Sequence, residues 1–243
     1  MKSETMSIRR HATRILSLWC ILLSAALGQD SGQGLHIRIL CFGRIAGAEK
    51  LWLADAKLPG AGQEVGLHLN NFTGPYQTKT RDLVLTERPF EDGQAPPKAV
   101  VKVTVPNSLG GRILLILTPR EADGASYLGI PIRDDQAGFA PGERRFVNLT
   151  NHPIGGDFDG KRTLIKPNTL TSLKLAAPPA DRQNHEVVFH YQSEGKWMPL
   201  SSSVWPYDPE ARSLVFCFWS PAEKRIRFQS IAELPASEEP EAN

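Results

Sequence analysis

The chain has 243 residues, with 28 Lys and Arg against 26 Asp and Glu, and 41% of its residues are hydrophobic, which is enough to fill a core. Four of the basic residues and one acidic residue lie in the first 28 positions, so the remainder carries 24 basic and 25 acidic side chains, a net charge of −1. Because no dense Lys/Arg cluster remains, the composition excludes the strongly basic surface that nucleic-acid binding needs.

Residues 1–28 have the pattern of a secretory signal peptide. A basic start is followed by an apolar run over 15–27, broken only by two serines and too short to cross a bilayer. The small residues Ala26 and Gly28 predict cleavage between Gly28 and Gln29. No later run is long enough to cross a membrane, so we expect a signal-peptide helix and an exported mature chain, periplasmic or extracellular, without a transmembrane segment.

Apolar and polar residues alternate in several short stretches of the mature chain. Val65–Leu69, Val101–Val105 and Arg225–Gln229 each show a period of two, which is typical of a strand with one face in the core and one in water. Ile113–Leu117 and Leu214–Trp219 are apolar on both faces. These two stretches are predicted to be central strands that are covered on both sides.

Turn residues support the same fold class. Asp159-Gly160 and Glu194-Gly195 each separate two strand-like stretches and predict two-residue hairpins. With 20 Gly and 19 Pro in the chain, no mature segment keeps a long helical period. We therefore expect an all-β protein of a dozen or more short strands, arranged as β-sandwiches of the immunoglobulin-like or a similar type.

Two stretches resemble each other and indicate a repeat. Arg112–Glu121 and Arg212–Glu223 both begin with Arg, continue as a doubly apolar strand and end in a hydroxyl-Pro-x-Glu turn. The repeat predicts tandem β-sandwiches, with one continuous domain as the alternative. The predicted organisation is a signal peptide (1–28), a first sandwich (29–121), a linker or connecting strand (122–143), a second sandwich (144–232) and a disordered acidic tail (233–243).

Two cysteines remain after cleavage. Cys41 and Cys217 each lie in an apolar, strand-like run, so we favour two buried thiols that pack as small hydrophobic residues. An exported protein also permits a disulfide between them. Sequence does not give the strand pairing on which such a bridge depends, and the alternative stays open.

The segment 155–162 is close to a phosphate-binding loop but has Arg162 where magnesium binding needs a hydroxyl. A hairpin turning at Asp159-Gly160 accounts for the same residues. Asp157 and Asp159 are two residues apart, which would place them on one face of a strand as a candidate acid or metal pair. Further oxygen ligands are missing from the surrounding sequence, so we favour an acidic hairpin tip in water.

His185 and His190 are five residues apart, not four as in a zinc-binding helix motif. On a strand, this odd spacing places the two imidazoles on opposite faces, where they cannot share a metal. The sequence also lacks a G-x-S-x-G nucleophile elbow. We therefore predict no catalytic residue, no metal ligand and no cofactor.

The aromatic pair Trp205 and Tyr207 lies in a Pro-containing stretch, 205–209, that is predicted to be a loop. Rings held on a stiff loop can stack on sugars or on the side chains of a partner, so these two residues form a candidate ligand-contact surface. The alternative, which we favour, is that Trp205 folds under the loop and covers the second core.

Residues 145–173 resemble the opening strands of uncharacterised exported bacterial β-sandwich modules. The resemblance is carried by Val147-Asn148-Leu149-Thr150, by Pro153, by the Asp159-Gly160 hairpin and by Leu164 and Pro167. It implies a β-protein of the cell envelope or periplasm, and it carries no catalytic residues.

The leading hypothesis from these features is an exported non-catalytic protein that binds or scaffolds in the cell envelope or extracellular space, with a protein or glycan partner. The alternative is an extracellular hydrolase or a carbohydrate-binding module, with its site on loops between the sandwiches, such as Val204–Pro209. A third hypothesis is a structural partner that pairs through an exposed edge strand.

Overall fold

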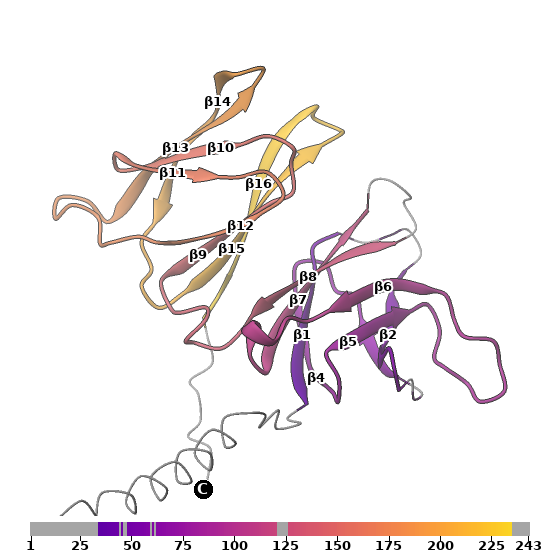
Figure 1. Cartoon of the computed structure of the whole chain (residues 1–243). Helices are drawn as coiled ribbons and strands as arrows, with labels where there is room; N and C mark the ends of the chain where they lie inside the picture. The colour runs from indigo at the N-terminus through magenta and orange to yellow at the C-terminus, as the bar shows by residue number, and fades with distance from the viewer. Residues whose placement is uncertain are drawn as a thin grey trace, which may run out of the picture.

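A computed structural model describes residues 34–43, 45, 48–58, 60, 62–120 and 126–234 (Figure 1). The prediction of an all-β protein is confirmed: the described residues form sixteen strands and one 3-10 turn, Asn107–Leu109, with no α-helix among them. The predicted signal peptide at 1–28, its cleavage between Gly28 and Gln29, and the tail from residue 235 onward lie outside the described residues.

The sixteen strands follow one another along the chain. They are β1 (Leu35–Cys41), β2 (Lys50–Asp55), β3 (Gln63–Gly66), β4 (Phe72–Thr78), β5 (Asp82–Thr86), β6 (Ala99–Thr104), β7 (Arg112–Pro119), β8 (Tyr127–Arg133), β9 (Glu143–Asn148), β10 (Ile154–Phe158), β11 (Lys161–Ile165), β12 (Leu170–Lys174), β13 (Asn184–Ser193), β14 (Lys196–Pro206), β15 (Arg212–Ser220) and β16 (Arg225–Glu233).

The strands form four sheets of four. Sheet A has the order β4-β1-β7-β8, sheet B β3-β2-β5-β6, sheet C β12-β9-β15-β16 and sheet D β11-β10-β13-β14. Strand β1 pairs in parallel with β7 in sheet A, and β9 pairs in parallel with β15 in sheet C. The other pairs between these strands are antiparallel. The strands β1–β8, here called unit 1, and β9–β16, here called unit 2, therefore have the same topology.

Three buried clusters show how the sheets pack. The first joins sheets A and B, with Ile37 and Leu53 fully buried, and the second joins sheets C and D, with Phe146 and Phe189. The third cluster draws its residues from sheets A and C and contains Leu114. Sheets A and C therefore pack against each other, and the two units share a hydrophobic core at their junction.

This arrangement explains the two doubly apolar stretches. In β7, Ile113, Leu115 and Leu117 belong to the cluster within unit 1, while Leu114 and Ile116 belong to the cluster between the units. The same alternation occurs in β15. The expectation that both strands are covered on both sides is confirmed for Ile113–Leu117 and for Leu214–Cys217, and the other unit provides the second cover. Trp219, at the end of the second predicted stretch, is exposed.

The hairpins turn where the sequence predicts. Asp159 and Gly160 have φ values of 49° and 85°, and Glu194 and Gly195 have 50° and 78°, so both residues of each turn are left-handed, as a type I′ hairpin requires. The predicted strand over 65–69 is shorter than expected, because β3 ends at Gly66.

Two segments differ from their predicted assignments. Residues 127–133, which the sequence places in a linker or connecting strand, form β8, the edge strand of sheet A that pairs with β7. Glu233, which the sequence places in the tail, ends β16 and binds two arginines. Gly129 and Pro131 interrupt the strand pattern of β8, yet an edge strand accommodates both residue types.

Cys41 and Cys217 lie in different cores. Cys41 belongs to the cluster within unit 1 and Cys217 to the cluster within unit 2, and both thiols are buried. The preferred interpretation, two buried thiols, agrees with this placement.

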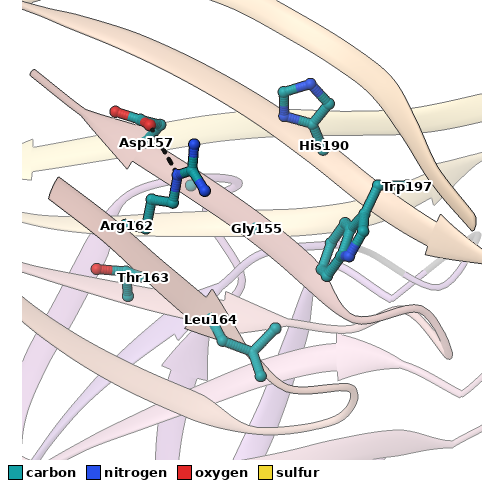
Figure 2. A pocket seen from close by; sticks show the side chains of 8 residues that line it. Gly155, Asp157, Arg162, Thr163, Leu164, His190 and Trp197 are labelled. Atoms are coloured by element: carbon teal, nitrogen blue, oxygen red, sulfur yellow. Dashed lines mark hydrogen bonds and ion pairs between the residues drawn. The ribbon is translucent and has the colours of Figure 1, made fainter. Parts of the chain in front are cut away.

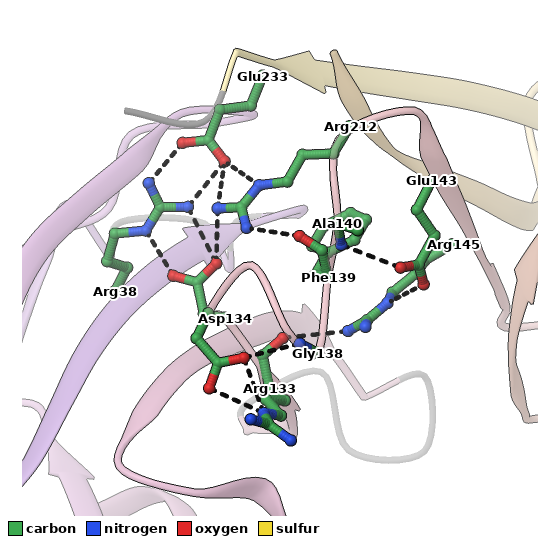
Figure 3. A network of polar contacts seen from close by, with 11 residues as sticks. Arg38, Arg133, Asp134, Gly138, Phe139, Ala140, Glu143, Arg145, Arg212 and Glu233 are labelled. Atoms are coloured by element: carbon green, nitrogen blue, oxygen red, sulfur yellow. Dashed lines mark hydrogen bonds and ion pairs between the residues drawn. The ribbon is translucent and has the colours of Figure 1, made fainter. Parts of the chain in front are cut away.

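An ion-pair network crosses the junction between the units (Figure 3). Arg38 from β1 and Arg212 from β15 each bind the carboxylates of both Asp134 and Glu233. Arg212 and Asp134 are 2.8 Å apart, and their side chains are only 5% and 6% exposed. Arg212 also packs over the ring of Phe139, 4.8 Å from its centre. The network therefore fixes unit 1 to unit 2 around the edge of their shared core.

A buried asparagine ties together one corner of unit 2. The Asn148 side-chain amide donates to the carbonyl oxygens of His152, Ile165 and Lys166, and its oxygen accepts from the backbone N–H and the hydroxyl of Thr150. Asn148 is 1% exposed. The Val-Asn-x-Thr element on which the sequence resemblance rests is thus structural: it joins the end of β9 to the end of β11.

Candidate functional site

An apolar hollow of unit 2 lies on the outer face of sheet D (Figure 2). We call it the Trp197 groove. It has a volume of about 530 Å³ and is lined by Gly155, Gly156, Asp157, Arg162, Thr163, Leu164, His190 and Trp197. Strands β10, β11, β13 and β14 all contribute residues to it.

The two hairpins bring these residues together. The turn at Asp159-Gly160 fixes the register between β10 and β11, in which Asp157 lies opposite Arg162 and Gly155 lies opposite Leu164. On the other side of β10, Gly155 lies opposite His190 of β13. Alternate residues of a strand face the same side, so these side chains gather on the outer face of the sheet.

The floor of the groove is a residue without a side chain. A Cβ atom at Gly155 would lie 3.2 Å from Cζ3 and 3.4 Å from Cη2 of Trp197, so the indole leans over the glycine. Trp197 is 48% exposed, and Leu164, on the opposite side of the floor, is 51% exposed. The groove therefore has Leu164 on one side of Gly155, while the Trp197 indole packs over the glycine from the other side.

Polar side chains complete the rim. Nε of Arg162 lies 3.4 Å from the carboxylate of Asp157, and the Arg162 side chain is 88% exposed. Asp157 also accepts a hydrogen bond from the backbone N–H of Gly160 at 2.7 Å, which holds its carboxylate toward the turn. His190 lies across Gly155 from the ion pair (Figure 2). A ligand in the groove would thus meet an indole, a guanidinium, a carboxylate and an imidazole.

Trp205 and Tyr207, the predicted ligand-contact pair, lie elsewhere. Trp205 is part of β14, not of a loop, and its ring is nearly parallel to that of Phe146, with the ring centres 6.1 Å apart. It packs against the core of unit 2, the alternative that the sequence favours. Tyr207 packs edge-on against His185. Contact between these two rings and a ligand stays a prediction.

The two histidines face opposite sides of β13, as predicted. His185 is 2% exposed and faces inward, whereas His190 lines the groove on the outer face. Nδ1 of His185 lies 2.6 Å from the carboxylate of Asp159. This hydrogen bond, together with one from the backbone N–H of Glu186, holds the pKa of Asp159 below its usual value.

Asp157 and Asp159 are therefore held by different groups. Asp157 binds Arg162 and the turn, while Asp159 binds His185 and Glu186. In the described part of the chain, no group of three or more His, Cys, Asp and Glu residues is placed to hold a metal ion.

The groove cannot be predicted from the sequence, because its residues come from four strands whose register the sequence does not show. One feature of the sequence does indicate a close approach at this place. Gly155 and Gly156 interrupt the strand before the Asp159-Gly160 turn, and a glycine inside a strand marks a place where another group approaches closely. At Gly155 that group is the indole of Trp197.

Neither family models nor curated proteins identify a relative of this chain. The resemblance of residues 145–173 to exported bacterial modules therefore stays a hypothesis. None of the described residues belongs to a helix with the length and apolar character needed to span a membrane.

Proposed function

We propose that this chain is an exported, non-catalytic binding protein made of two tandem β-sandwiches, of the immunoglobulin-like or a similar type, that holds a carbohydrate in the Trp197 groove. Unit 1 and the junction act as a scaffold that presents sheet D of unit 2. The shared core and the ion-pair network support this role, because they hold the two units in one orientation. The place of action is the cell envelope or the extracellular space.

The observation that carries the proposal is the exposed indole of Trp197, which packs over Gly155 in the groove. A sugar ring has an apolar C–H face and a rim of hydroxyl groups. The C–H face packs on an aromatic ring, and the hydroxyl groups need hydrogen-bond donors and acceptors. Asp157, Arg162 and His190 supply both kinds of polar group within the same groove.

The arrangement of carboxylates favours binding over hydrolysis. Most glycoside hydrolases place two carboxylic groups on either side of the bond that they cleave. Here Asp157 lines the groove and is occupied by Arg162 and Gly160, while the neighbouring Asp159 is bonded to His185, which faces inward. Asp159 does not line the groove.

The binding experiment compares two tryptophans of similar exposure. The mature protein is titrated with a panel of neutral and acidic polysaccharides, and the best ligand is then tested with W197A and with W219A. Trp219 is 46% exposed and lies on β15, outside the groove. We expect W197A to weaken binding by about 30-fold, the effect of losing about 2 kcal/mol at a binding hot spot, and W219A to bind like the wild type.

A complementary variant displaces the indole without removing it. Valine at Gly155 suits a strand, but its side chain would push against the Trp197 ring that packs over the glycine. We expect G155V to lose binding as W197A does. Equal affinities of the wild type and both variants, or no saturable binding to any polysaccharide in the panel, would contradict the proposal.

Export has its own test. Intact-mass analysis of the protein recovered from a secreting host should show a chain that begins at Gln29. A mature mass that retains the first 28 residues would contradict cleavage at Gly28.

A further inference from the structure

The two units differ at one edge although their topologies are the same. In each unit, one sheet packs against the other unit (the inner sheet, A or C) and one does not (the outer sheet, B or D). The edge strands on one side are β6 of sheet B and β8 of sheet A in unit 1, and β14 of sheet D and β16 of sheet C in unit 2. In unit 1 these edges pack together. In unit 2 a cleft of about 280 Å³ opens between them.

The register shows which residues occupy equivalent positions. The residue that directly follows the first strand of each unit donates its backbone N–H to the seventh strand, from Phe42 to the carbonyl oxygen of Leu117 in unit 1 and from Leu149 to that of Cys217 in unit 2. Leu117 and Cys217 therefore correspond to each other. Leu117 pairs with Gly129 of β8, and Cys217 pairs with Phe228 of β16. Gly129 of unit 1 is therefore the counterpart of Phe228 in unit 2.

The difference between Gly129 and Phe228 explains why the two edge strands are packed together in unit 1 and separated by a cleft in unit 2. A Cβ atom at Gly129 would lie 3.0 Å from a methyl group of Val101, so the glycine allows β6 to approach β8. In unit 2 the Phe228 ring packs on Phe189, with the ring centres 4.3 Å apart, and occupies the space between the sheets. The bulkier residue keeps the two edges of unit 2 apart.

The β14–β16 cleft combines an apolar interior with a positively charged mouth. It is lined by Phe189, Leu200, Ser201, Ser203, Trp205, Arg225, Ile226, Arg227 and Phe228. Phe189 and Ile226 at its base belong to the core of unit 2. Arg225 and Arg227 both bind the single carboxylate of Glu223, at 2.6 Å, so one positive charge at the mouth is not neutralised by it.

These features fit one kind of ligand. An apolar chain would gain by leaving water for the space beside Phe189 and Phe228. An anionic end would be attracted to the guanidinium groups of Arg225 and Arg227, which suit carboxylates. We propose that the β14–β16 cleft is a second binding site, for an amphipathic carboxylate such as a medium-chain fatty acid, with its chain between the sheets and its carboxylate at the two arginines.

This site is separate from the Trp197 groove. The groove lies on the outer face of sheet D, whereas the cleft opens between sheets D and C and shares no lining residue with it. Polysaccharide binding and fatty-acid binding can therefore succeed or fail independently.

The experiment titrates the mature protein with hexanoate, octanoate and decanoate, below their aggregation concentrations, by calorimetry. We expect saturable binding with one site, and an affinity that rises about two- to fourfold for each added CH₂ group as more chain is buried. Decanol, which has the chain without the charge, should bind at least tenfold more weakly than decanoate. No saturable binding, or no dependence on chain length, would overturn the proposal.

Matched variants locate the site. Ser201 lines the cleft, whereas the adjacent Ser202 does not, and both are exposed. We expect S201F to fill the cleft and abolish decanoate binding, and S202F to leave it unchanged. R227Q should weaken decanoate binding at least fivefold but leave decanol binding unaltered. Equal effects of the two serine variants, or an unchanged affinity in R227Q, would place the ligand elsewhere and overturn the proposal.

Discussion

Phe42, which follows β1 in unit 1, stacks on Phe216 of β15 in unit 2, with the ring centres 3.9 Å apart and the planes at 16°. Phe218 meets the same Phe42 ring edge-on, at 5.3 Å. These contacts lie within the core that sheets A and C share. The units are therefore joined by packed aromatic rings as well as by charges, and unit 2 is presented in a defined orientation.

The first prediction concerns the charges at the junction. Replacing Asp134 with Ala leaves the buried Arg212 and its neighbour Arg38 without one of their two carboxylates. We expect D134A to lower the free energy of unfolding by about 3–5 kcal/mol, the usual cost of breaking a buried ion pair on one side. Urea unfolding at neutral pH measures this change.

An exposed ion pair provides the control. Glu64 binds Lys50, and both side chains are more than half exposed. E64A should cost less than about 1 kcal/mol. Similar losses in D134A and E64A would show that the junction network contributes little.

The second prediction concerns Asn148. Its side chain satisfies three backbone carbonyl groups and the N–H of Thr150 inside the protein. Because N148A removes these hydrogen bonds, including the buried ones with Ile165 and Thr150, we expect the free energy of unfolding to fall by about 3 kcal/mol. N184A, at an exposed position of β13, should change stability by less than about 0.5 kcal/mol. A stable N148A protein would contradict the structural role of the Val-Asn-x-Thr element.

The third prediction concerns acid stability. Burial alone would raise the pKa of Glu233, but the hydrogen bonds and charges of Arg38 and Arg212 outweigh it and hold the pKa below its usual value of 4.5. Since the pKa is lower in the folded state, the stabilisation from Glu233 is present above about pH 4.5 and is lost as the pH falls through the folded value. The junction should therefore weaken in acid.

The corresponding measurement is the free energy of unfolding in urea between pH 7 and pH 3, for the wild type and E233Q. The variant should be less stable at pH 7 and should lose less stability on acidification, because it lacks this titrating group. Parallel pH profiles for the two proteins would show that Glu233 does not couple protonation to folding.

The fourth prediction concerns the thiols. Burial raises the pKa of Cys217, and Cys41 is buried in the other unit. We expect neither thiol of the mature protein to react with Ellman's reagent before unfolding, and both to react in urea, because the thiolate is the reactive form and needs access to the reagent. A mature chain that gains two mass units on reduction would instead reveal a disulfide.

Fold class and turns could be predicted because they depend on local pattern. The doubly apolar strands at 113–117 and 214–219 required cover on both faces, and Asp159-Gly160 required a hairpin. The sequence does not show that the second face of each of these strands is covered by the other unit, because this depends on contacts between distant segments. The sequence left 122–143 as a linker or connecting strand, because Gly129 and Pro131 resemble loop residues, although both are tolerated in an edge strand such as β8.

The candidate site was less accessible to sequence analysis. Trp205 and Trp197 lie on the same strand, and a bulge between them, opposite Phe189 and His190, complicates the alternation of faces. Trp205 was therefore predicted as a candidate ligand contact from the sequence, although it packs inward and Trp197 is the more exposed ring. Only the register of three strands, β10, β13 and β14, brings Trp197, Gly155 and His190 together.

Carbohydrate binding by unit 2 at the Trp197 groove can be followed through the indole N–H signals in NMR spectra of the mature protein. The best polysaccharide of the panel, or an oligosaccharide derived from it, is titrated in, and the signals are assigned with single tryptophan variants. We expect the Trp197 signal to shift in a saturable way while those of Trp52, Trp205 and Trp219 stay in place. A shift confined to other tryptophans, or no shift at saturating ligand, would contradict it.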